Sequence, residues 1–139
     1  MFGSPRVLLL VCDPTERDRW QEMLAPHALL TFACNIRETQ ELLEASRYDA
    51  VFCAWSLCEG TWNDVLKELR HSSPDLPIII VSRAAGEQQW VQVLEAGAFD
   101  LLGPPYREPL VLSVLEQAVA SREARGWHRN IEPYKAKVS

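Results

Sequence analysis

Short apolar runs alternate along the chain with segments in which apolar residues recur every three or four positions. Each run is short enough for a buried strand, and each is followed by a segment of helical period. This alternation predicts repeated βαβ units around a parallel sheet that is buried on both faces. The predicted strands span residues 6–11, 28–33, 50–54, 78–82 and 99–102. The predicted helices are one that buries Trp20, Met23 and Leu24, followed by 37–46, 61–70, 87–96 and 108–122.

Two helix ends carry recognisable signals. Asp13 is placed to cap the first helix, Pro14 suits its first position, and Glu16 is placed to complete a capping box. Gly97 follows the fourth helix, at the position where a left-handed residue often ends a helix. These signals support the boundaries that the hydrophobic pattern predicts.

The connection rules of α/β proteins narrow the topology. Crossovers between parallel strands are right-handed, and the flavodoxin-like order is a common solution for five strand–helix units. We therefore expect an α/β fold of the flavodoxin-like (βα)5 type, a doubly wound five-stranded parallel sheet, and by analogy with such folds we expect the strand order 2-1-3-4-5. The 139 residues suffice for one core, so we expect a stand-alone domain at 1–125 and a C-terminal tail at 126–139.

Composition narrows the class of function. Apolar residues make up 47% of the chain and charged residues 24%, as in globular proteins. The net charge of -5 disfavours direct binding to nucleic acid. The four cysteines lack zinc-ligand spacing, and the apolar run 7–11 is too short for a signal peptide or a membrane span. We expect a cytoplasmic protein with reduced thiols, no metal, no cofactor, and no nucleic-acid or membrane partner.

Three stretches resemble the receiver domains of bacterial response regulators. They are VLLLVCDP at 7–14, YDAVFCA at 48–54 and LEAGAFDLL at 94–102. The LEAGA segment, followed by the pair Pro105-Tyr106, is the most specific part. The resemblance covers about residues 6–122 and implies the same flavodoxin-like fold.

Receiver domains carry their site at the carboxyl ends of the strands. The family uses an acidic pair that binds Mg²⁺, an aspartate that accepts the phosphoryl group, a hydroxyl residue, and a lysine that precedes a proline. The resemblance places the acidic pair at Val11 and Cys12, with Asp13 one position later. It places the remaining family positions, in the same order, at Ala54, Ser82, Pro104 and Pro105.

Only Ser82 keeps the residue type of the family. Ala54 has no nucleophile, Pro104 has neither a charge nor a donor, and Asp13 alone would bind Mg²⁺ poorly. The resemblance therefore implies a degenerate pseudo-receiver that is not phosphorylated on aspartate and is not an enzyme. We expect it to act by protein–protein interaction in two-component or phosphorelay signal transduction.

Receiver domains commonly bind partners through the surface of the fourth helix, fifth strand and fifth helix. The partners implied here are a histidine kinase, a response regulator, an output protein, or a second copy in a homodimer. Trp90 and Phe99 have a competing interpretation as core residues, whereas Val91 and Leu94 are expected to face the sheet. The candidate interface residues are Arg83, Trp90, Phe99, Leu101 and Tyr106.

Two other classes of function remain as alternatives. A ligand- or redox-sensing domain would use a pocket bounded by Cys12, Ala54, Cys58 and Ser82. In that case a cavity is expected, whereas a plain adaptor is expected to fill the same space with Trp55 and Trp62. A flavodoxin-like cofactor enzyme is disfavoured, because the loop 12–16 lacks the run of Gly or Ser that wraps a phosphate.

Overall fold

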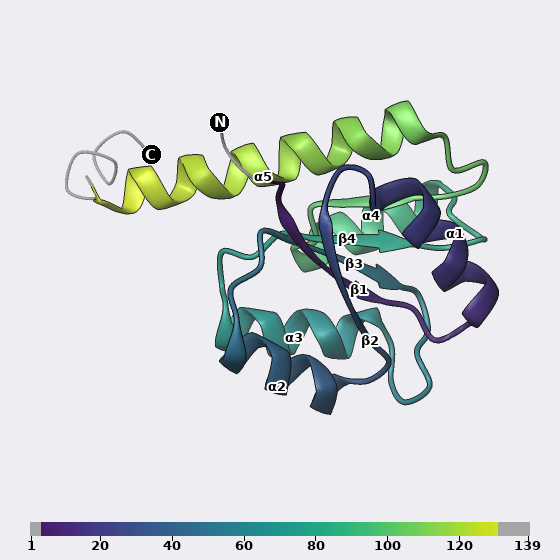
Figure 1. Cartoon of the computed structure of the whole chain (residues 1–139), viewed down its shortest axis with the longest axis horizontal. Coiled ribbons are helices and arrows are strands. Elements are labelled where there is room, and N and C mark those ends of the chain that lie inside the picture. The colour runs from purple at the N-terminus through teal and green to yellow at the C-terminus, as the bar shows by residue number, and fades with distance from the viewer. Residues whose placement is uncertain (1–3, 131–139) are drawn as a thin grey trace.

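Five short parallel strands form the centre of the molecule, in the order β2-β1-β3-β4-β5 (Figure 1). This order confirms the fold class and the strand order predicted from the sequence. The computed structural model describes residues 4–130. The strands are β1 (Arg6–Leu10), β2 (Leu29–Ala33), β3 (Ala50–Ala54), β4 (Ile78–Val81) and β5 (Asp100–Leu102). Four of them are one residue shorter than predicted, and β3 has the predicted bounds.

Helices cover both faces of the sheet. The helices α1 (Pro14–Leu24) and α5 (Glu108–Asn130) pack on one face, where Trp20 and Val111 are buried. The helices α2 (Ile36–Ala45), α3 (Trp62–Ser72) and α4 (Glu87–Ala96) cover the other face, where Leu69 and Val93 are buried. Figure 1 shows α5 on one side of the sheet and α2 and α3 on the other.

Apart from Arg6 at the start of β1, the central strands β1, β3 and β4 are apolar, because both faces of the sheet are covered there. In β1, Leu8 and Leu10 point into the α2–α3–α4 layer, whereas Val7 and Leu9 point into the α1–α5 layer. All four side chains are fully buried. Leu29, at the start of the edge strand β2, is 60% exposed.

The first helix begins as predicted but lacks the predicted capping box. The Asp13 carboxylate accepts a hydrogen bond from the Thr15 N–H at 3.2 Å, and Pro14 is the first helical residue. The prediction that Glu16 would complete the capping box is wrong, because its carboxylate forms ion pairs with Arg19 and Arg83 instead.

Two other helices differ from the prediction. In α4, Val93 faces the sheet, whereas Val91, which was predicted to face it, is 42% exposed. The end of α4 is as predicted, because Gly97 follows it with φ 110°. The fifth helix continues to Asn130, eight residues beyond the predicted end at 122, because no proline interrupts it there. The first five residues of the predicted tail 126–139 are thus helical, and 131–139 lie outside the described residues.

Candidate functional site

A cleft opens where the carboxyl ends of β1, β3 and β4 meet. This is the edge at which open α/β sheets usually place their sites. The cleft has a volume of about 350 Å³, at the small end of the range for ligand pockets. We call it the strand-end cleft; it is lined by Val11, Cys12, Asp13, Glu16, Trp20, Ala54, Trp55, Ser56, Val81, Arg83 and Tyr106.

The last residue of β3 contributes no reactive group to the strand-end cleft. Ala54 is partly buried and pairs in register with Val81 of β4. Its neighbour Trp55 continues the sheet contact by donating its N–H to the Val81 carbonyl at 3.0 Å. At the end of β1, Val11 is 2% exposed and apolar. The ends of β1 and β3 thus present buried or partly buried apolar side chains to the cleft.

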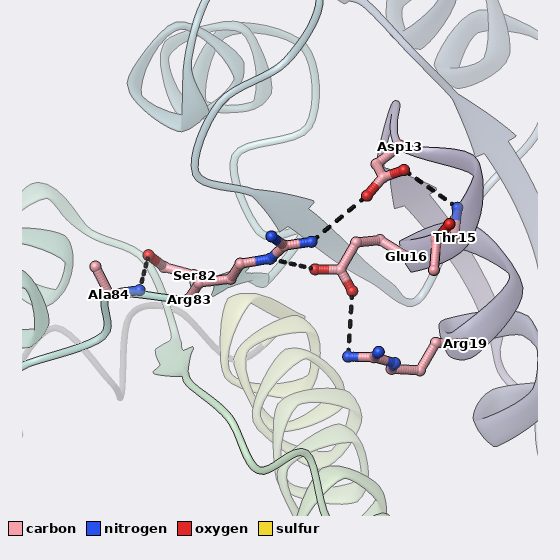
Figure 2. Close-up of polar contacts among 7 residues, drawn as sticks. All are labelled: Asp13, Thr15, Glu16, Arg19, Ser82, Arg83 and Ala84. Carbon is pink, nitrogen blue, oxygen red and sulfur yellow. Dashed lines mark hydrogen bonds and ion pairs between the residues drawn. The ribbon is translucent and has the colours of Figure 1, made fainter.

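An arginine from the β4–α4 connection reaches across the cleft to α1 (Figure 2). Arg83 Nη2 lies 3.5 Å from Asp13 Oδ2, and Arg83 Nε donates a hydrogen bond to Glu16 Oε1 at 3.3 Å. The second Glu16 oxygen lies 3.6 Å from Arg19 Nη1. Two carboxylates and two guanidinium groups therefore form one ion-pair network with balanced formal charge.

Glu16 is the member of this network whose charge most needs compensation, because its side chain is the most buried of the four. Its side chain is only 14% exposed, whereas that of Arg83 is 74% exposed. Glu16 Oε2 is buried and has no hydrogen-bond partner among the described residues. Exposed ion pairs contribute about 0–1 kcal/mol, but an uncompensated buried carboxylate costs more. Both guanidinium groups therefore compensate a charge that the fold has partly removed from water.

Ser82, Pro104 and Pro105 do not line the strand-end cleft. Ser82 is 8% exposed, and its hydroxyl oxygen accepts a hydrogen bond from the Ala84 N–H at 3.1 Å. Figure 2 shows this hydroxyl engaged with Ala84, while the neighbouring Arg83 side chain extends toward α1. Pro104-Pro105 is a cis peptide, and both prolines are exposed. The Ser82 hydroxyl thus shapes a turn and does not face the cleft.

The cysteines do not support the sensing pocket proposed as an alternative. Cys12 lines the strand-end cleft together with Ala54, but Cys58 and Ser82 do not. The Cys12 thiol donates to the Cys34 carbonyl at 3.1 Å and accepts the Cys58 N–H at 3.1 Å. Burial raises the pKa of the Cys12 thiol to about 12, which keeps it neutral and poorly nucleophilic at physiological pH.

We expect Cys12 to react with iodoacetamide roughly 50-fold more slowly at pH 8 than an ordinary exposed thiol, because little thiolate is present. Its rate should still be rising at pH 10, since its pKa is about 12. Cys58 is exposed and should be modified first. Alkylation followed by peptide mass spectrometry measures both rates, with Cys58→Ser as the control. Equal rates at the two cysteines would contradict a partly buried, neutral Cys12 thiol.

The two tryptophans near the end of β3 have different surroundings. Their rings pack at a centroid distance of 5.4 Å. Trp62 is 4% exposed and belongs to the core beneath α2 and α3, whereas Trp55 is partly buried and lines the cleft. The cleft therefore remains open beside Trp55, and the expected complete filling by both rings is not observed.

The candidate interface residues are distributed between surface and core. Trp90 is 46% exposed, and its indole N–H donates to Asp100 Oδ1 at 3.2 Å. Leu101 is 7% exposed and lies in the core. Phe99 and Tyr106 are partly buried in the α1–α5 layer, where the ring centroids of Tyr106 and Trp20 lie 4.8 Å apart. Arg83 and Trp90 are the most exposed members of the set, with Arg83 mainly and Trp90 about half exposed.

The cleft does not suit the Mg²⁺ ion that the receiver resemblance implies. Mg²⁺ requires several oxygen ligands in octahedral geometry. Val11 and Cys12 offer no oxygen side chain, and Asp13 is already bonded to the Thr15 N–H and paired with Arg83. Among residues 4–130, no group of three or more His, Cys, Asp or Glu side chains is arranged to hold a metal ion.

The ion-pair network includes residues that the sequence analysis did not join. The sequence pattern predicts a capping role for Glu16 and an interface role for Arg83. The usable signal was the i, i+3 spacing of Asp13 and Glu16, which puts both carboxylates at the start of α1 facing the strand ends. The position of Arg83 across the cleft required the tertiary structure.

The strand order and the strand-end cleft define a flavodoxin-like domain with its site at the carboxyl ends of the strands. A family model described as the response regulator receiver domain matches residues 10–116. The chain belongs to the response regulator receiver domain family, and is thus a receiver domain of two-component signalling. Such domains are typically non-enzymatic and interact with kinases and other signalling proteins. Within residues 4–130, no helix has the length and apolar character needed to cross a membrane.

One curated relative is the response regulator protein PilR of Pseudomonas aeruginosa, which is 28% identical over 121 residues. The match covers 86% of this chain and 26% of PilR, so the chain spans about a quarter of that protein.

Several solved structures share the fold. The signal receiver domain of an HD domain-containing protein from Pseudomonas fluorescens Pf-5 has a TM-score of 0.78 at 21% identity, covering 88% of this chain and 99% of that one. The receiver domain of sensor histidine kinase PA1611 from Pseudomonas aeruginosa PAO1 has a TM-score of 0.75 at 21% identity, covering 85% and 99%. That structure has a magnesium ion coordinated in its active site cleft. At these identities the likeness shows the fold alone.

Proposed function

We propose that this receiver domain does not accept a phosphoryl group on aspartate and acts by binding other signalling proteins, without enzymatic activity. The observation that carries the proposal is Ala54 at the end of β3, facing the strand-end cleft. The carboxylates that line the cleft, Asp13 and Glu16, are both engaged by Arg83 and lie on α1 or at its start. This arrangement supports a domain without an aspartate phosphoacceptor or a metal site in the cleft.

Partner binding is proposed to use the exposed surface of α4 around Trp90. Trp90 is partly exposed, and a hydrogen bond to Asp100 orients its indole. Tryptophan is among the residue types that contribute most to binding energy at protein interfaces. Candidate partners are a histidine kinase, a response regulator, an output protein or a second copy of the chain. Because no phosphorylation step is available to the proposed domain, this surface is constitutive.

We expect the affinity for a partner to be the same before and after incubation with Mg²⁺ and acetyl phosphate. The partner is first identified by affinity capture with the wild-type chain, and the dissociation constant is then measured with both proteins purified. An ordinary receiver domain with its own partner serves as the positive control for the phosphodonor. A several-fold change in affinity for this chain after treatment would overturn the proposal.

A further inference from the structure

The Arg83 ion pairs join two segments that are far apart in the sequence. Asp13 lies at the start of α1, while Arg83 lies in the connection between β4 and α4. The guanidinium contacts one oxygen of Asp13 and one of Glu16, at 3.5 and 3.3 Å. It therefore spans the mouth of the strand-end cleft and supplies positive charge to both carboxylates.

We propose that Arg83 is a built-in cation that neutralises Asp13 and Glu16, excludes divalent metal ions from the strand-end cleft, and fixes the β4–α4 connection against α1. A divalent cation and a guanidinium compete for the same carboxylate oxygens, and arginine stays charged at all physiological pH values. The remaining Asp13 oxygen accepts the Thr15 N–H at the helix N-terminus, where the helix dipole further disfavours a cation.

Other contacts hold the same connection. Besides the Ser82–Ala84 hydrogen bond, Ala85 lies so close to Gly103 that a Cβ built on Gly103 would be 2.6 Å from the Ala85 Cβ. The connection leads directly into α4, which carries Trp90. A fixed connection thus accounts for a constitutive α4 surface, and this last consequence rests on the proposed partner-binding function.

The test is a Mn²⁺ titration of the full chain, with free Mn²⁺ measured by electron paramagnetic resonance. Arg83→Ala is expected to bind one Mn²⁺ at least about 10-fold more tightly than wild type, because a neighbouring positive charge has been removed. The double variant Arg83→Ala/Glu16→Gln should return to the wild-type level. Arg37→Ala, which removes an exposed arginine from α2, is the matched control and should behave as wild type.

The proposal is overturned if Arg83→Ala binds Mn²⁺ no more tightly than Arg37→Ala while its circular dichroism stays native. It is also overturned if wild type binds Mn²⁺ tightly and Glu16→Gln abolishes that binding. Arg83 is mostly exposed, so folding should survive; Arg83→Met keeps the aliphatic stem and provides a second variant for the same titration. Neither readout involves phosphorylation or a partner, so failure here is distinguishable from failure of the proposed function.

Discussion

Replacing Trp20 by alanine is expected to lower the free energy of unfolding by about 3–5 kcal/mol. Trp20 is 1% exposed, and its ring lies 5.6 Å from the ring of Phe52 and 4.8 Å from that of Tyr106. It therefore joins α1, β3 and the segment before α5 in one apolar layer. Since the free energy of unfolding of such domains is only about 5–15 kcal/mol, this substitution removes a large part of the stability of the fold.

Urea denaturation followed by circular dichroism measures this effect. Trp90→Ala is the matched control, because it removes the same side chain from an exposed position and should cost less than about 1 kcal/mol. Trp20→Phe retains a ring and should give an intermediate loss, which keeps the comparison measurable if Trp20→Ala does not fold. Similar losses for Trp20→Ala and Trp90→Ala would contradict the packing of α1.

The second large effect concerns binding. Trp90→Ala is expected to weaken the affinity for the captured partner by roughly 30-fold, equivalent to about 2 kcal/mol for a hot-spot tryptophan. Isothermal titration measures binding to a separate protein, and sedimentation velocity measures self-association. Asp100→Asn should have a smaller effect, because it weakens only the hydrogen bond that orients the indole.

The control for this experiment removes another exposed apolar side chain. Leu29→Ala acts on β2, at the opposite edge of the sheet from β5, where Leu29 is 60% exposed. Its partner affinity should equal that of wild type. If Leu29→Ala weakens binding and Trp90→Ala does not, the partner surface has been placed on the wrong edge of the domain.

The fold was predictable because its signals are local or periodic. The apolar runs identified all five strands, and Asp13 and Gly97 marked helix ends that the structure confirms. The orientation of α4 was less accessible, because both Val91 and Val93 fit an apolar stripe and only packing against the sheet selects Val93. The end of α5 was missed because its last turns lack an apolar period while remaining compatible with a helix.

One residue of the strand-end cleft could be placed from the sequence, and the ion pairs across the cleft could not. Ala54 at the end of β3 could be placed by position alone, and the structure puts it in the strand-end cleft. The ion pairs of Arg83 could not be placed, because the pair with Glu16 joins side chains 67 residues apart in the sequence, on different elements. Sequence spacing predicts contacts within one helix, but not which arginine reaches that helix from another strand end.

The central claim is that no aspartate of this chain accepts a phosphoryl group. The direct measurement is the intact mass of the purified chain after incubation with Mg²⁺ and acetyl phosphate, with an ordinary receiver domain as the positive control. We expect an unchanged mass for this chain and an added phosphoryl group on the control. A stoichiometric, hydroxylamine-sensitive phosphoryl adduct would contradict the central claim. It would identify the chain as a working switch whose phosphoacceptor lies at a position other than 54.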